Sequence, residues 1–127
     1  MCGWQVLSAL PLPELPPVEG AHSPEPDITI AFGDIPDELP EPRFRGPLLQ
    51  VGSDGATRLG LPLGLTFLVD PRGRHVTIAT KLPADSPAIR AFLLGNVLAL
   101  ICLRRGALPL HASCVGVPTA QGEVAIA

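Results

Sequence analysis

The sequence predicts an α+β fold in which a mostly antiparallel sheet of five to seven short strands packs on one long helix, at about residues 87–105. Three observations support this prediction. The chain has 16 prolines and 13 glycines among 127 residues, and most of them precede residue 73, which indicates short strands joined by tight turns. Apolar and polar residues alternate in several segments between residues 27 and 80. One long apolar segment follows, bounded by helix-start and helix-stop residues.

The cleanest alternation lies in residues 27–32. Ile28, Ile30 and Phe32 fall on one face of an extended chain, and the residues between them fall on the other. We therefore expect a half-buried strand there. Weaker strand candidates are residues 5–10, 48–51 and 57–61. The proline-rich segments expected to be loops are residues 11–26 and 33–47.

A hairpin is predicted around residue 70. Residues 65–69 and 75–80 are apolar or alternating segments of strand length, and they flank a four-residue turn. Asp70 at the first turn position, Pro71 at the second and Gly73 at the fourth favour a type I turn.

The expected helix has recognisable ends. We expect the hydroxyl of Ser86 to cap the free amides, and Pro87 suits the first helical position. Arg104 and Arg105 would lie at the negative end of the helix dipole. Gly106 would then take the left-handed conformation that closes many helices.

The expected helix is apolar on nearly every side. Its most polar stripe consists of Arg90, Leu94, Val97, Ile101 and Arg104, and even the middle of this stripe is apolar. Such a helix is buried on more than one side. We expect one side to face the sheet and the most polar stripe to be the least covered, so that the isolated chain self-associates through the exposed apolar helix.

Composition argues against several classes of function. Hydrophobic residues make up 46% of the chain and charged residues 17%, with a formal net charge of −3, which argues against disorder and against nucleic-acid binding. The apolar run 92–103 would span only about 18 Å as a helix, less than the ~30 Å core of a bilayer, so no membrane span is expected. The N-terminus shows no signal-peptide pattern, and we expect a cytoplasmic protein.

The sequence offers no metal site. Cys2, Cys102 and Cys114 are widely spaced, so neither a zinc site nor a disulfide framework is indicated. The acidic loop at residues 34–41 lacks the spacing of a calcium loop and reads as a solvated segment. The Pro13–Pro16 P-x-x-P sequence has no nearby basic residue to orient docking, so packing on the body is expected instead.

One polar pair stands out on an expected strand at residues 110–117. His111 and Ser113 are two residues apart, so they share a face of that strand. A serine-protease role would also need an orienting carboxylate and oxyanion donors, and nothing nearby supplies them. A histidine held by a backbone carbonyl, with a tolerated serine, is the structural interpretation of the pair.

Three segments together resemble the HPr serine kinase/phosphorylase-like P-loop kinases. The sequence LPLHASCV at residues 108–115 precedes a turn and EVAIA at 123–127, as in the stretch before the phosphate-binding loop of that family. ALPLPELPP at residues 9–17 is similar to the family's proline-rich opening. Residues 85–113 have its helix followed by LHAS.

The resemblance implies an N-terminal α+β domain at residues 1–106 and the first strands of a P-loop kinase core at residues 107–127. We expect the chain to end in a hairpin, in which a turn joins the expected strand at residues 110–117 to a short apolar strand at 124–127. This hairpin would lead into a G-x-x-x-x-G-K-[ST] loop. The full-length form would bind ATP and Mg²⁺ and phosphorylate a hydroxyl of a protein or peptide. This chain, in which that loop is absent, is expected to hold no cofactor and to be inert alone.

The resemblance also gives His111 a tentative catalytic role. In the family, the histidine of this segment lies on a strand beside the phosphate-binding loop, where an imidazole can hydrogen-bond phosphate or influence a catalytic carboxylate. The structural interpretation of His111 stays open beside it. A second function is open as well, namely a self-sufficient protein- or peptide-binding module that uses its proline-rich loops and has no catalytic activity.

Overall fold

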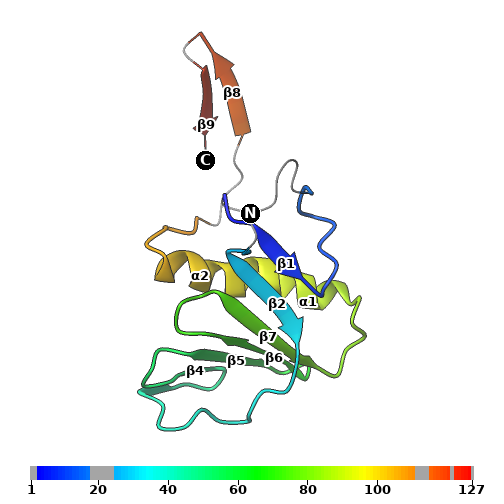
Figure 1. Cartoon of the computed structure of the whole chain (residues 1–127), viewed down its shortest axis with the longest axis vertical. Helices are drawn as coiled ribbons and strands as arrows, with labels where there is room; N and C mark the ends of the chain where they lie inside the picture. Colours follow the sequence, from blue (N-terminus) through cyan, green and yellow to red (C-terminus); the bar gives the residue numbers. More distant parts are fainter. Residues whose placement is uncertain (1–2, 18–24, 111–114, 121, 127) are drawn as a thin grey trace.

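The computed structural model describes residues 3–17, 25–110, 115–120 and 122–126. It contains a seven-stranded mixed sheet, one helix in three segments and a separate two-stranded hairpin (Figure 1). The strands of the main sheet are β1 (Val6–Ser8), β2 (Ile28–Phe32), β3 (Phe44–Arg45), β4 (Leu49–Val51), β5 (Thr57–Leu61), β6 (Leu65–Val69) and β7 (His75–Thr80). The helix comprises α1 (Pro87–Phe92), the π-helical segment η1 (Leu93–Val97) and α2 (Leu98–Arg104). The hairpin comprises β8 (Val115–Thr119) and β9 (Gly122–Ile126).

The α+β class is confirmed, with a sheet that is mixed. Its strand order is β1-β2-β7-β6-β5-β4-β3. Strands β3 to β7 form an antiparallel meander, as expected. The two N-terminal strands are parallel to their neighbours, with Val6 opposite Ile28 and Ile30 opposite Val76. Local alternation could not predict this, because it does not determine which distant strand becomes a neighbour.

Most strands of the meander have the bounds that the sequence pattern predicted. β5, β6 and β7 have the predicted bounds, and β4 begins one residue later than expected. The predicted turn closes β6 and β7, since the Gly73 amide donates to the Asp70 carbonyl over 3.0 Å. β3 was not predicted, because it contains two residues within a segment dominated by proline and charge.

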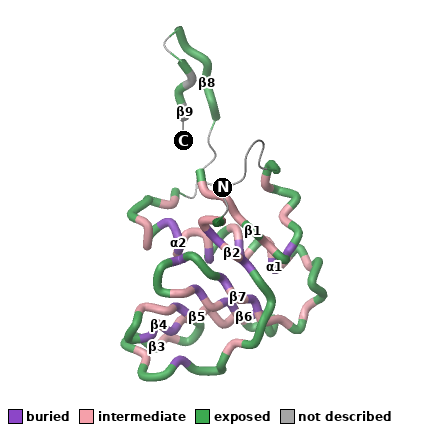
Figure 2. The backbone as a smooth tube through the Cα atoms, viewed as in Figure 1, coloured by how far each residue is buried: buried purple, intermediate pink, exposed green. Residues whose placement is uncertain are grey.

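The core lies between the helix and one face of the sheet (Figure 2). Alternate residues of the strands point into it, including Phe67 at 0% exposure and Ile78 at 1%. Ile28 and Ile30 are buried as predicted, whereas Phe32 is 38% exposed. Phe32 lies at the last position of β2, so its side chain reaches past the covered part of the sheet.

The prediction of the least covered helix stripe is wrong at its centre. Val97 is 0% exposed and Ile101 is 2% exposed, because they continue the buried row begun by Ile89 and Leu93. The side that faces solvent carries Gly95, Asn96 and Leu103 instead. By length and composition alone the helix Pro87–Arg104 could cross a membrane, yet its inner row packs in the core of the sheet.

The two helix ends differ in how well they were predicted. Pro87 occupies the first turn, but the Ser86 side chain makes no capping hydrogen bond, and its carbonyl accepts the Ile89 amide instead. At the other end Gly106 has φ of 73°. Its amide donates to Leu103, and the next amide donates to the Cys102 carbonyl over 2.9 Å. These two bonds form the glycine-closed helix end that was expected.

Candidate functional site

The outer face of the helix forms one wall of an apolar groove. The π-helical segment η1 inserts into the middle of the helix, and such segments occur frequently at functional sites. Gly95 and Asn96 of η1 are exposed. A methyl group added to Gly95 would contact nothing within 4 Å, so the glycine is not required by packing within the described chain. This part of the helix is open to close approach from outside.

Two arginines at the end of the helix attach it to the sheet and so position residues 107–110, which follow the helix and form the second wall of the groove. Arg104 Nη1 donates to the carbonyls of Asp70 and Pro71 over 2.8 and 2.9 Å. Its Nη2 donates to the Gly55 carbonyl and to the Thr57 hydroxyl. One guanidinium thus ties the helix to two separate turns of the meander.

Arg105 continues this attachment on the other side. Its Nη2 donates to the carbonyls of Asp27 and Gly73 over 2.8 and 3.0 Å. Its guanidinium also lies 4.4 Å from the centre of the Trp4 ring, within the range of a cation–π interaction. The residues after Gly106 consequently leave the body from a fixed point.

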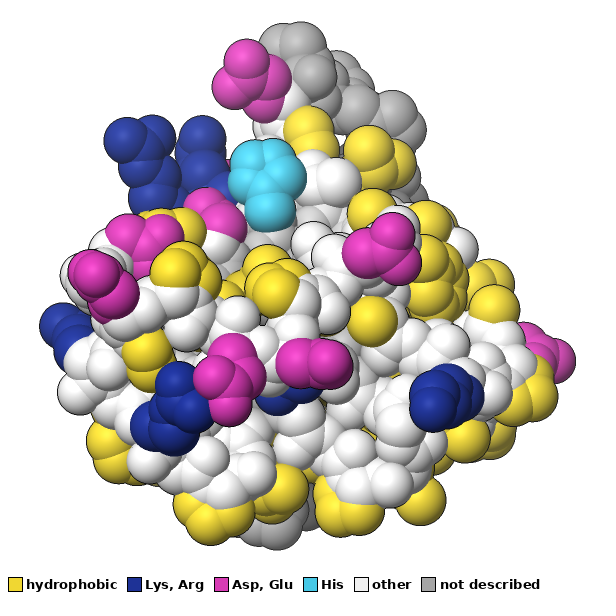
Figure 3. Space-filling view, turned by 90° about the horizontal axis from the view of Figure 1, so that it is seen from below, with side chains coloured by type: hydrophobic (Ala, Val, Ile, Leu, Met, Phe, Trp, Pro, Cys, Tyr) yellow, Lys and Arg dark blue, Asp and Glu magenta, His cyan; other side chains and the backbone are white. Residues whose placement is uncertain are grey.

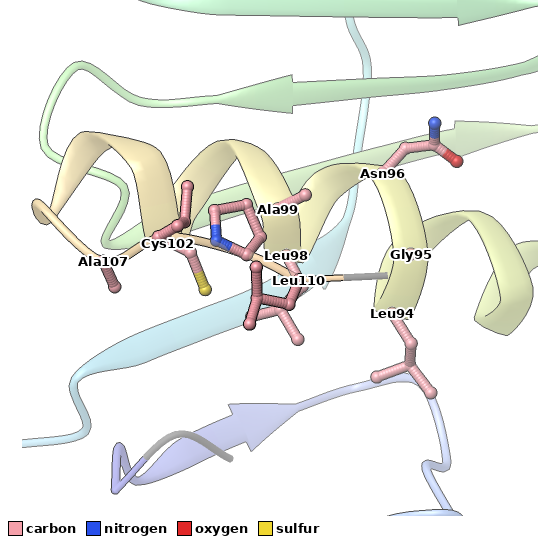
Figure 4. Close-up of a pocket in the computed structure, with 10 residues that line it drawn as sticks. Leu94, Gly95, Asn96, Leu98, Ala99, Cys102, Ala107 and Leu110 are labelled. Carbon is pink, nitrogen blue, oxygen red and sulfur yellow. The ribbon is translucent and has the colours of Figure 1, made fainter. Parts of the chain in front are cut away.

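The second wall is residues 107–110, which run back beside the helix. With Leu94, Leu98, Ala99 and Cys102 they enclose a groove of about 680 Å³ (Figure 4). Asn96 projects away from its centre, whereas Leu98 and Leu110 lie near the centre of the view. Among the residues that the structure describes, none that lines the groove is charged. The described lining is therefore that of an apolar binding surface.

Exposed apolar side chains extend from the groove wall at residues 107–110 into the hairpin. Leu108 and Leu110 are 77% and 65% exposed. In the hairpin, Val117 pairs with Val124 across the two strands, and Val115 and Val124 are at least half exposed. The hairpin stands away from the body, and the side chains described in it are exposed (Figure 2). One proline, Pro118, lies within β8, which is typical of an edge strand.

The predicted site residue His111 and its neighbour on the expected strand, Ser113, lie outside the described residues, because the structure describes no residue between 110 and 115. The structure describes only their surroundings in the chain. Leu110 lines the groove before them, and Val115 begins β8 after them. The interpretation of His111 as catalytic or structural is therefore a matter for experiment.

Two carboxyl groups of the described chain have shifted pKa values, and both have structural partners. Burial would raise the pKa of Asp70. The backbone amides of His75, Arg74 and Arg72 donate hydrogen bonds to its carboxylate, and together they hold the pKa below its usual value. The hydrogen bond from Arg90 Nε, 2.7 Å long, lowers the pKa of Glu14.

Within the described ranges, no three His, Cys, Asp or Glu side chains come close enough to hold a metal ion. Cys102 is a buried free thiol, while Cys2 and Cys114 lie outside the described residues. The proline-rich segment is attached to the body by the ion pair of Glu14 with Arg90, and Leu12 packs against the core.

Sequence reasoning missed the groove and the arginine attachments. The run of two arginines before Gly106 was a visible signal, but it was assigned only to the helix dipole. The hydrogen-bond partners of the two arginines lie 32 to 78 residues away in the chain. Comparison of the chain with protein-family models, with curated proteins and with solved structures gave no significant match.

Proposed function

We propose that this chain is the N-terminal region of an HPr serine kinase-like phosphotransferase. The observation that carries the proposal is the sequence LPLHASCV at residues 108–115, which is followed along the chain by a hairpin that stands away from the body. In such kinases an apolar strand runs directly into the phosphate-binding loop. β9 is a short strand with the mostly apolar sequence GEVAI, and the described side chains of the hairpin are left exposed by the main sheet.

In this proposal the two parts of the chain have different roles. Residues 1–106 form the N-terminal domain, and residues 107–127 supply the first strands of the kinase core, with the hairpin leading into the P-loop. The longer form would bind ATP and Mg²⁺ and transfer the γ-phosphoryl group to a hydroxyl of a protein or peptide, in the cytoplasm. The residues of this chain do not fit a nucleotide by themselves, because its single lysine, Lys81, lies outside any glycine-rich phosphate loop.

The direct test reads the DNA beyond codon 127. We expect a G-x-x-x-x-G-K-[ST] sequence within about five codons, in frame or after repair of one frameshift, because the phosphate loop follows its strand immediately. A stop codon followed by unrelated sequence in all frames would contradict the proposal.

Calorimetry on the chain alone gives a second test. Titration with Mg-ATP should give no saturable binding, since the backbone cradle for phosphates is absent from residues 1–127. Micromolar, saturable affinity would show that a different phosphate site exists and that the proposed division is wrong.

The role of His111 is testable in the longer protein. If the imidazole serves the phosphate site, His111→Ala should lower phosphoryl transfer about tenfold or more, with little change in melting temperature. Ser113→Ala is the matched control and should do much less. If His111 is instead a buried structural group, its removal should cost about 1 to 3 kcal/mol of stability and leave specific activity normal.

A second candidate function is a self-sufficient protein- or peptide-binding module. The apolar groove beside η1 favours it, since an apolar peptide fits such a groove without any catalytic group. A natural stop codon after Ala127 in a maintained gene would support this candidate over the kinase.

A further inference from the structure

A second groove lies where β2 leaves the sheet. It has a volume of about 680 Å³ and is more polar than the groove beside the helix. The loop after β2 forms one side, and the neighbouring ends of β6 and β7 form the other. Its polar lining consists of Asp34, Asp37, Arg58, Thr66, Thr80 and Lys81. We call it the polar groove.

The polar groove exists because two neighbouring strands have different lengths. β2 pairs with β7 only as far as Phe32 opposite Ile78, and the Gly33 amide then donates to the Ile78 carbonyl over 3.0 Å. β7 continues to Thr80, and the Lys81 amide bonds to Gly64 on the β6 side. Backbone groups of successive residues point to opposite sides of a strand. The backbone of Thr80 therefore faces the place that β2 has left.

Two cations reach this groove over glycines. A methyl group on Gly64 would lie 3.3 Å from Lys81 Cδ, so the lysine stem packs directly over the glycine. A methyl group on Gly60 would lie 2.8 Å from Arg58 Nη1. The Arg58 guanidinium uses Nε for the Pro36 carbonyl, at 2.8 Å, which leaves its Nη groups available. Side chains at the two glycines would displace the cations.

Two carboxylates, Asp34 and Asp37, come from the loop on the other side. Neither they nor the two cations take part in any ion pair of the described residues, which join Arg45 to Glu38, His75 to Asp70 and Arg90 to Glu14. Acidic and basic side chains lie side by side on the lower surface of the molecule, without a patch of one sign (Figure 3). The polar groove thus presents both signs of charge, and none of these four side chains forms an ion pair among the described residues.

We propose that the polar groove binds an extended peptide that carries one acidic and one basic side chain. The peptide backbone pairs with β7 at Thr80, in the line that β2 vacates. The peptide carboxylate lies between Lys81 and Arg58, and the basic group faces Asp34 and Asp37. Charge complementarity selects this occupant, because a peptide of one sign satisfies one pair of groups and is repelled by the other. The inference needs only the folded body and is independent of the proposed kinase function.

Fluorescence anisotropy on residues 1–127 tests it with labelled eight-residue peptides, in the absence of ATP. An alternating Glu-Lys peptide should bind saturably, and all-Glu, all-Lys and all-Gln peptides should bind at least tenfold more weakly. Lys81→Gln and Arg58→Gln should each weaken the alternating peptide about fivefold or more. Arg72→Gln, which removes an exposed cation outside the groove, is the matched control and should leave affinity unchanged.

Circular dichroism melts of each variant confirm that the fold is intact. Equal binding of all-Glu or all-Gln peptides would overturn the proposal, as would an equal loss in Arg72→Gln or no binding of the alternating peptide at millimolar concentration. A variant that unfolds is replaced by Asp37→Asn, which should weaken the alternating peptide and spare the all-Glu peptide. Failure of this assay leaves the reading-frame test of the kinase proposal unaffected.

Discussion

The seven-stranded body and the β8–β9 hairpin are built from similarly apolar sequence but differ in how that sequence is used. In the body, alternate residues of β6 and β7 are 0 to 2% exposed against the helix. In the hairpin, Val115 and Val124 are at least 50% exposed. An isolated two-stranded hairpin is at best marginally stable in water. The body therefore accounts for its own stability, while the hairpin needs a partner surface to bury its valines.

The largest expected effect tests whether the helix and sheet of the body form one core. Ile101→Glu places a carboxylate at a position that is 2% exposed, and we expect a loss of about 4 kcal/mol or more. Leu103→Glu is the matched control, because Leu103 is two residues away and 58% exposed. Urea unfolding followed by circular dichroism compares them. Equal stability of the two variants would show that the helix packs on another face.

The helix also shows where sequence-based prediction succeeds and where it fails. Its ends were predictable from Pro87 and Gly106, whose backbone preferences act locally. Its buried face was not, because a helix that is apolar on every side has little amphipathic asymmetry to indicate which side meets the sheet. Val97 and Ile101 were therefore assigned to the wrong side. The π-helical segment left no pattern that distinguishes it from ordinary helix.

In the sheet and the candidate sites, too, features set by local sequence were predictable and features set by distant contacts were not. The turn Asp70–Gly73 and its two strands were predictable, since the turn residues and the alternation agree. The parallel placement of β1 and β2 depends on contacts between distant segments, as do both grooves and the bonds of Arg104. His111 stood out in the sequence as one of a polar pair on an expected strand, but its catalytic role came only from the resemblance, and that role stays a prediction.

A smaller effect is expected at the attachment between helix and meander. Arg104→Met keeps an apolar stem but removes the donors to the Gly55, Asp70 and Pro71 carbonyls. We expect a loss of about 2 kcal/mol, since hydrogen bonds from a charged group contribute about 1.5 to 3 kcal/mol each and water replaces some of them here. Arg72→Met, at an exposed position of the same turn, should change the free energy of unfolding by less than about 0.5 kcal/mol. If Arg104→Met lowered the free energy of unfolding no more than Arg72→Met does, the hydrogen bonds of Arg104 would not be needed for stability.

The turn itself should give the body a dependence on acid. The folded pKa of Asp70 is lowered overall, despite burial, by the amides of residues 72, 74 and 75. The contribution of Asp70 to the free energy of unfolding is therefore fully present above the pKa of the unfolded chain, about 3.9. It is lost as the pH falls through the lower pKa of the folded protein. Asp70→Asn should be less stable than the natural chain by about 1 kcal/mol at pH 7, and the difference should shrink near pH 2. A difference that is the same at both pH values would exclude this mechanism.

The smallest expected effect on the body comes from the hairpin, and it tests the comparison most directly. Val117→Thr combined with Val124→Thr replaces a cross-strand apolar pair without touching the core. Because the hairpin lies outside that core, the free energy of unfolding of the body should change by less than about 0.5 kcal/mol. The same variant should lower self-association, measured by sedimentation at high protein concentration, since it removes exposed apolar area. Leu7→Thr, at a 60% exposed position on the edge strand β1, is the control for general surface polarity and should leave association unchanged. A body that melts several degrees lower in the double variant would mean that the hairpin packs on it, and the two regions would then be one cooperative unit.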